Sequence, residues 1–411
     1  MIRQEIDSPY AWLRLALTMI MATIGGVGLW SVVVAFPAVQ ADFNAARSEA
    51  SLPFTCASVG IAIGSVVMGR LVDKAGLIRP LLIGAVSLGS GYVAASLTGN
   101  IWLFSAVYLF IGMFGSAATF VPLVSDITFW FEKRRGLAVS IFTSGNYLAG
   151  AIWPPVVEYL TRTHGWRQAH WMIGIFCLLT MPAMAMLLRS RSPRRAAGAP
   201  PIPVVNRKIA LPPGALQALL SVAGLACCVA MAMPQVHIVA YCGDLRYSAA
   251  DGARMLSLML GFGIISRIGS GFLADKVGGV MTLLIGSIAQ MVALALYLMM
   301  DGLTALYVIS ALFGLFQGGL IPSYAIIVRE NYPPRETGSR VGVILMMTLL
   351  GMGLGGWMSG VIYDRTGSYE AAFANGVAWN AVHVVITLFL LLRSANARRT
   401  ATARPAASAA E

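Results

Sequence analysis

The feature that most constrains this chain is an apolar run, about 17–25 residues long, that recurs along its length with short polar breaks. A run of this length is what an α-helix needs to cross the hydrocarbon core of a bilayer. Inside a bilayer every backbone N–H and C=O must be bonded within its own segment, so the runs predict helices. Charged residues make up 11% of the chain, whereas a soluble domain carries about a quarter. We therefore predict an all-α integral membrane protein.

The breaks divide the apolar runs into twelve predicted transmembrane helices, six on each side of one longer break. That break is rich in Arg and Pro and predicts a cytoplasmic linker at residues 191–211. We expect a six-helix bundle at residues 1–190, a second at 212–394, and a disordered, basic cytoplasmic tail at 395–411. The predicted spans are residues 12–37, 51–71, 79–98, 101–125, 136–160, 168–189, 213–240, 252–273, 279–300, 303–328, 338–362 and 371–393.

The net charge of +12 is scattered in short clusters between the apolar runs, so it does not indicate a nucleic-acid partner. Most of the basic residues fall in every second break, as the positive-inside rule requires of cytoplasmic loops. This alternation predicts that both termini are cytoplasmic. We expect the protein to lie in the inner (plasma) membrane of a bacterium. The clusters on the predicted cytoplasmic side include Arg70, Lys74 and Arg79; Lys133, Arg134 and Arg135; and Arg189, Arg191, Arg194 and Arg195.

An eight-residue pattern occurs twice, at the cytoplasmic end of the second predicted helix of each half. Gly69-Arg-Leu-Val-Asp73-Lys-Ala-Gly76 and Gly271-Phe-Leu-Ala-Asp275-Lys-Val-Gly278 both read G-x-L-x-D-K-x-G. Two copies at equivalent positions indicate duplicated, pseudo-symmetric halves. Each Asp can accept hydrogen bonds from a neighbouring helix N-terminus and so latch the halves together. The alternative is a tight turn with solvated charges, and the pattern leaves both interpretations open.

The repeated pattern resembles the loop signature of the major facilitator superfamily. Three further stretches, together with Arg267-x-x-x-Gly271, resemble the branch that holds monocarboxylate transporters and oxalate/formate antiporters. The resemblance covers residues 12 to 393 and implies two six-helix bundles around a central cavity, with alternating access by rocking. The three stretches are Phe131-Glu-Lys-Arg-Arg-Gly136-Leu-Ala, Gly165-Trp-Arg167 and Val236-His237-Ile-Val-Ala-Tyr241.

Arg267 is the only basic side chain that we place well within a span. An intramembrane charge is costly and usually faces a cavity, which makes it a candidate functional group. A guanidinium without a neighbouring carboxylate suits an anion, and its fork matches a carboxylate. The resemblance implies that Arg267 binds the substrate carboxylate. The alternative is a structural Arg that bonds helix carbonyls of the other half.

His237 is the second candidate, because an imidazole with a pKa of about 6.5 can take a proton from a mildly acidic exterior. The resemblance implies a role in substrate or proton handling, and the alternative is a bond to a neighbour at the interface. Further candidates for lining the cavity are Asn146, Tyr147, Gln317 and Tyr324. Each of these polar side chains could equally make a hydrogen bond between helices.

Three departures from the branch bear on the substrate. Animal monocarboxylate transporters place an Asp one turn before the Arg and a Lys in the first helix. Here Gly263 takes the place of the Asp, and the first span has no Lys. Oxalate transporters add a second cation in the eleventh helix, which residues 341–362 lack. One buried cation balances one negative charge, so a monoanion is favoured over a dianion.

We therefore predict a monomeric secondary transporter for a small organic anion, with a monocarboxylate favoured and proton coupling expected. The alternative is a carrier that exports amphipathic or neutral compounds. An enzyme is not expected, because the chain has no H-E-x-x-H and no G-x-S-x-G, and the absence of a P-loop argues against ATP-driven pumping. No cofactor is expected, and the five cysteines show no metal-ligand spacing.

Overall fold

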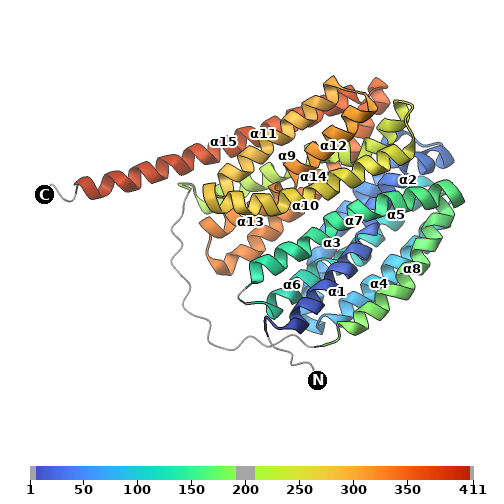
Figure 1. The fold of residues 1–411 in the computed structure, drawn as a ribbon, viewed down its shortest axis with the longest axis horizontal. Helices are drawn as coiled ribbons and strands as arrows, with labels where there is room; N and C mark the ends of the chain where they lie inside the picture. The colour runs from blue at the N-terminus through green and yellow to red at the C-terminus, as the bar shows by residue number, and fades with distance from the viewer. Residues whose placement is uncertain (1–5, 133, 191–208, 408–411) are drawn as a thin grey trace.

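The computed structural model describes residues 6–132, 134–190 and 209–407. Over these residues the chain is almost entirely helical and contains no β-strand. Figure 1 shows two bundles one above the other, with the N-terminal half in blue to green and the C-terminal half in yellow to red. The predicted fold class, a helical membrane protein made of two helical bundles, is confirmed.

The N-terminal half contains six crossings, two of which are broken into shorter helices. The first is interrupted at Gly26, and the fourth passes through a π-helical turn and a 3₁₀ turn near its middle. Such turns are common where a helix is under local strain or has a functional role. The helices are α1 (Pro9–Gly25), α2 (Val27–Phe43), α3 (Arg47–Ala75), α4 (Ile78–Ser96), α5 (Ile101–Phe110), η1 (Ile111–Ser116), η2 (Ala117–Thr119), α6 (Val121–Trp130), α7 (Arg135–His164) and α8 (Trp166–Leu187).

The C-terminal half repeats this arrangement, and again its fourth crossing is broken, here between α12 and α13. The last helix continues past residue 394, where the expected tail begins, and Figure 1 shows it projecting beyond the bundle. Most of the expected linker and residues 408–411 lie outside the described residues. The helices are α9 (Pro213–Asp244), α10 (Ala249–Val277), α11 (Gly279–Met299), α12 (Leu303–Gln317), α13 (Leu320–Asn331), α14 (Pro334–Thr366) and α15 (Glu370–Ala407).

Among the described residues, 11 helical segments are long and apolar enough to cross a membrane. The remaining predicted crossing is α7, which has 30 residues. It is less apolar than the others because polar residues, among them Thr143 and Asn146, lie in its middle. A bilayer crossing with polar groups at mid-depth is expected to face other helices or a polar path rather than lipid.

Both copies of the repeated pattern end a helix in the same way. Gly76, with φ of 74°, follows α3, and Gly278, with φ of 85°, follows α10. These left-handed conformations favour glycine, which has no Cβ to clash. We call the end of the molecule that holds these two turns the motif end, and the opposite end the closed end.

Two antiparallel helix pairs, α3 with α14 and α7 with α10, join the halves. At the closed end a Cβ added at Gly360 would lie 2.8 Å from the Arg47 carbonyl oxygen, and near mid-length Gly353 faces Thr55 at 3.4 Å. Toward the motif end Gly338 and Gly342 of α14 have no neighbouring atom within 4 Å of such a Cβ. The α3–α14 pair is therefore packed tightly at the closed end and is not in contact at these motif-end glycines.

The α7–α10 pair follows the same trend. Gly263 lies directly against the Tyr147 ring, and Gly150 lies against Leu260. Gly271, one turn after Arg267 toward the motif end of α10, again has no neighbour within 4 Å. The glycines at mid-depth thus allow the two halves to approach closely where the candidate residues lie.

Candidate functional site

Arg267 leaves α10 and reaches α7 of the other half. Its Nη1 donates a hydrogen bond to the Thr143 carbonyl oxygen at 2.9 Å, and its Cζ lies 4.5 Å from the Tyr147 ring centroid. Its Nε is enclosed and has no acceptor. Within the described part of the chain, no acidic side chain forms an ion pair with Arg267. The guanidinium is thus positioned by a carbonyl and a ring, and its charge is not neutralised.

Gly263 explains how the Tyr147 ring can lie beneath the guanidinium. A side chain at residue 263, one turn before Arg267, would occupy the space that the ring fills. The ring face stabilises the cation without supplying a negative charge. Nη2 forms no hydrogen bond to a described residue and is not among the enclosed atoms. This nitrogen is the part of Arg267 that remains available to an anion.

The two candidates on α7, Asn146 and Tyr147, differ in environment. Tyr147 is buried and forms one wall beside Arg267. Asn146, its neighbour on α7, is partly exposed, and the described residues offer it no hydrogen-bond partner. Tyr147 therefore contacts Arg267, whereas the amide of Asn146, one residue earlier, has no hydrogen-bond partner among the described residues.

Gln317 and Tyr324 both make hydrogen bonds between helices of the C-terminal half. The Gln235 amide donates to the Gln317 Oε1 at 2.7 Å, and the Tyr324 hydroxyl lies 3.0 Å from the His383 Nε2. The second ring nitrogen of His383 lies 2.8 Å from the Ser287 hydroxyl. Both candidates are buried, so in this structure they take the helix-joining role that the sequence left open.

His237 lies inside the closed end. Its Nε2 donates to the Gly356 carbonyl oxygen at 2.7 Å, and its Nδ1 lies 2.9 Å from the Tyr369 hydroxyl. Its ring meets Phe36 of α2 edge-on, with the centroids 5.3 Å apart. The side chain is 0% exposed. Both nitrogens have protein partners in this structure, so neither is free to bind a substrate.

Beside His237 lies an interhalf cluster that the sequence did not reveal as a site. The Arg47 guanidinium contacts the Asp244 carboxylate at 2.5 Å and lies over the rings of Tyr363 and Tyr369, with Cζ 4.7 and 5.8 Å from the two centroids. Asp364 accepts hydrogen bonds from the first backbone N–H groups of α3. The sequence feature that could have indicated this cluster lies in the residues around Asp364.

A buried ion pair corrects the prediction that Arg267 is the only basic side chain within a span. Arg14 of α1 is 1% exposed, its Nε donates to Asp126 at 2.7 Å, and its Nη2 donates to the Leu188 carbonyl oxygen. Its Cζ also lies 4.7 Å from the Trp130 ring centroid. From the sequence, Arg14 lies at the very start of the first predicted span, 12–37, and counts with the cytoplasmic basic residues, while the fourth span ends at residue 125, one position before Asp126. Helix α6 continues to Trp130, which places the acid inside the bundle.

The repeated motif is described only in part. The Asp73 side chain lies outside the described residues, although its backbone belongs to α3. Asp275 is exposed, and no hydrogen bond to it is described. Gly69 lies 3.7 Å from Val121, measured from an added Cβ, and Gly271 has no such neighbour. The latch and the solvated turn therefore both remain predictions for Asp73 and Asp275.

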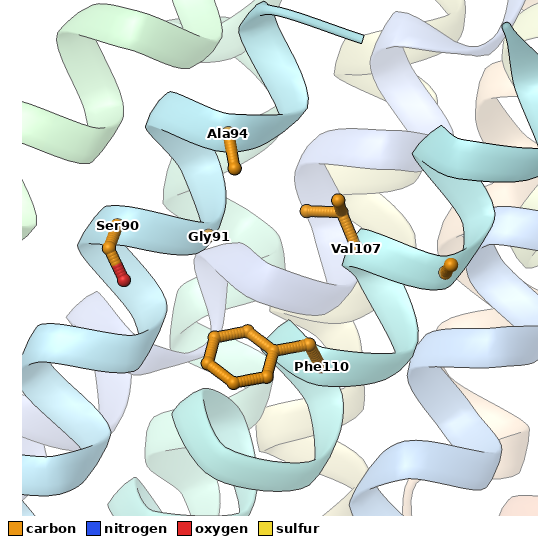
Figure 2. A pocket seen from close by; sticks show the side chains of 6 residues that line it. Ser90, Gly91, Ala94, Val107 and Phe110 are labelled. Carbon is orange, nitrogen blue, oxygen red and sulfur yellow. The ribbon is translucent and has the colours of Figure 1, made fainter.

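A hollow on the N-terminal half lies between α4 and α5. Figure 2 shows Val107 and Phe110 of α5 facing Ser90, Gly91 and Ala94 of α4. Its lining has no charged group and belongs to one half only. It therefore lacks the features of an anion site.

Comparison of this chain with known protein families identifies the class of protein to which it belongs. The sequence profile of the Major Facilitator Superfamily matches residues 18–304 and 280–410. The chain therefore belongs to the major facilitator superfamily and is a membrane transporter rather than an enzyme.

Its relatives lie in both animals and bacteria. Monocarboxylate transporter 13 of Bos taurus is 26% identical over 385 residues, covering 89% of this chain and 86% of the relative. The uncharacterised MFS-type transporter YcxA of Bacillus subtilis is 24% identical and covers 95% of this chain and 97% of the relative. A solved bacterial homologue of the human lysosomal transporter Spinster, inward-facing and unoccupied, gives a TM-score of 0.68 at 16% identity over 95% of this chain and 96% of that one. That likeness supports the fold alone.

Proposed function

We propose that this transporter carries a small organic monoanion, most simply a monocarboxylate, by alternating access. The observation that carries the proposal is Arg267, whose guanidinium lies between the halves without an acidic partner among the described residues. A cation in such a place is costly unless an anion joins it. The relative named monocarboxylate transporter 13 supports the same substrate class.

A monoanion fits this site better than a dianion does. Arg14, which is buried, is already neutralised by Asp126 and also bonded to Leu188. Arg267 therefore supplies one unbalanced charge, and a second carboxylate would enter the bundle without a counter-charge. Proton coupling belongs to the proposal because a proton that travels with one anion makes the transport step electroneutral.

The proposal includes an orientation and a location. Basic residues of the positive-inside pattern flank the motif turns, so the motif end is proposed to face the cytoplasm. Full-length bacterial relatives, YcxA of Bacillus subtilis among them, support a bacterial inner membrane. We propose a monomer, in which the two halves of one chain enclose the substrate path.

Proton-driven uptake is the direct test of this function. Purified protein in proteoliposomes is expected to accumulate radiolabelled lactate or pyruvate when the side corresponding to the closed end is more acidic. A protonophore should abolish accumulation, and malonate should compete poorly. Uptake that is indifferent to the pH gradient would remove the proton from the proposal, and absence of uptake for every short monocarboxylate tested would remove the substrate class.

Trp30 is a further candidate for substrate contact. Its indole nitrogen is enclosed and has no acceptor, and the ring carbon beside it, Cε2, lies 3.0 Å from a Cβ added at Gly150 of α7. Leu260 of the other half meets Gly150 at the same point, two turns of α10 before Arg267. An unpaired buried donor is costly, and a bound acceptor would remove that cost.

Trp30→Phe keeps an aromatic ring and removes only the N–H donor. If the donor binds substrate, the KM for a 2-hydroxy acid such as lactate should rise about 2- to 10-fold, while propionate is affected less. Uptake kinetics for the two acids measure this. Trp102→Phe, at a residue that is 62% exposed, is the control, and equal effects on lactate and propionate would contradict the assignment.

A further inference from the structure

The signal around Asp364 is a third copy of the repeated pattern, located at the opposite end of the molecule. Gly360-Val-Ile-Tyr-Asp364-Arg-Thr-Gly367 has the Gly, Asp, basic and Gly positions of the two copies at the motif end. Like the other two copies, it ends its helix with a glycine of positive φ, because Gly367 has φ of 70° and its N–H bonds to the Tyr363 carbonyl oxygen, four residues earlier, at 2.7 Å. The corresponding bonds of Gly76 and Gly278 are both 2.9 Å.

In this third copy the contacts of the Asp are described. Its two carboxylate oxygens accept hydrogen bonds from the backbone N–H of Arg47 at 2.8 Å and of Ser48 at 2.9 Å. These are the first residues of α3, where N–H groups lack partners within the helix. Helix α3 belongs to the N-terminal half and α14 to the C-terminal half. A carboxylate of one half thus caps a helix of the other, where the helix dipole also favours negative charge.

Three further contacts join the first turn of α3 to helices of the C-terminal half. A Cβ at Gly360, one turn before Asp364, would lie 2.8 Å from the Arg47 carbonyl oxygen and from the Ser48 Cα. The Arg47 guanidinium bonds to Asp244 at the C-terminal end of α9. It also lies over Tyr363, which directly precedes Asp364. The first turn of α3 is therefore enclosed by residues of α9 and α14.

We propose that Asp364, Arg47 and Asp244 form a gate that holds the closed end shut, with the third copy of the pattern as its latch. Helices α3 and α14 are antiparallel, so the C-terminal end of each lies at the same end of the molecule as the N-terminal end of the other. Asp364 occupies this position at the closed end, and Asp73, near the C-terminal end of α3, occupies the equivalent backbone position at the motif end. The pattern thus places an Asp near the C-terminal end of each helix of this pair.

This arrangement accounts for opposed states of the two ends. The α3–α14 pair packs tightly at Gly360 and has no neighbour at Gly338 or Gly342. Rocking that brings Asp73 to the start of α14 must draw Asp364 away from the start of α3, because both helices are rigid rods. Loss of the charge-assisted bonds at Asp364 leaves α3 N–H groups to be satisfied by water, which the open state permits.

Distances between spin labels at both ends of the molecule test the gate. Gly99 and Gly302 have open space around an added side chain and lie in turns at the closed end, one in each half. Leu137 and Gly338 are the labelled positions at the motif end. Cys56, which is partly exposed, is replaced by Ala, and the four buried cysteines remain. Double electron–electron resonance on protein in lipid nanodiscs then reports both distances.

Asp364→Ala is expected to raise the population with a longer Gly99–Gly302 distance at least about tenfold, the factor that one charge-assisted hydrogen bond carries. The Leu137–Gly338 distance should shorten in the same population. Asp301→Ala, an exposed carboxylate at the same end, should leave both distances unchanged. Gly360→Ala should act like Asp364→Ala without changing any charge, and it decides the matter if the latter does not fold. Distances that match those of the parent protein in the folded variants would overturn the gate.

Discussion

Replacing Arg267 by Gln is expected to lower the kcat/KM for lactate uptake at least about 30-fold, because the site loses a cation that no described acidic residue balances. The Thr143 carbonyl and the Tyr147 ring that Arg267 contacts would remain in place. Gln can still donate to the carbonyl, so the packing of α7 on α10 should persist. Initial rates of labelled lactate uptake in proteoliposomes measure the change.

Two further variants test whether uptake depends on the guanidinium group itself, on its charge alone, or on its location along α10. Arg267→Lys keeps the charge but loses the planar fork, so an intermediate rate is expected. Arg254→Gln removes an arginine that is 64% exposed on the same helix, and uptake should match that of the parent protein. Full activity of folded Arg267→Gln protein would show that the substrate does not bind there.

Removing Arg14 is expected to lower the free energy of unfolding by about 3–5 kcal/mol, because the Asp126 carboxylate would stay buried without its partner. The pair is almost completely enclosed, at 1% and 5% exposure. Arg14→Met therefore leaves a charge in a low-dielectric environment, while the side-chain volume is largely kept. Unfolding in increasing fractions of SDS, followed by circular dichroism, gives the free energy.

The double variant Arg14→Met, Asp126→Leu is the matching control, since it removes both charges and should recover most of the lost stability. Glu336→Gln breaks a more exposed pair with Arg340 on α14, and a change below about 1 kcal/mol is expected. If Arg14→Met costs no more than Glu336→Gln, the buried pair does not stabilise the N-terminal half.

The helices were predictable because their signal is local. A bilayer requires a long apolar run for each crossing, and residues 12–37 or 213–240 carry that signal without reference to any other segment. Interruptions within a crossing were less accessible. The break between α12 and α13 falls at Gly318 and Gly319 inside a segment that is apolar on average, so mean hydropathy alone does not reveal it.

The candidate site depends on contacts between segments far apart in sequence, and this limited its prediction. Arg267 stands out because it is a charge inside an apolar run, whereas its partners Thr143 and Tyr147 are more than a hundred residues away. Arg14 and Asp126 sit at the edges of their runs, where a charge looks solvated until the helices are packed. Asp364 carried a readable signal, because its spacing to Gly360 and Gly367 repeats that of the two predicted motifs.

Ligand-induced stabilisation of the parent protein and of Arg267→Gln tests the central claim most directly. Lactate, its neutral amide lactamide and the dianion malonate are compared at equal concentrations, and the melting temperature is followed as each is added. Lactate alone should raise the melting temperature of the parent protein, and it should fail to do so for Arg267→Gln. Equal stabilisation by lactamide, or an undiminished response to lactate in the variant, would contradict a carboxylate bound at Arg267.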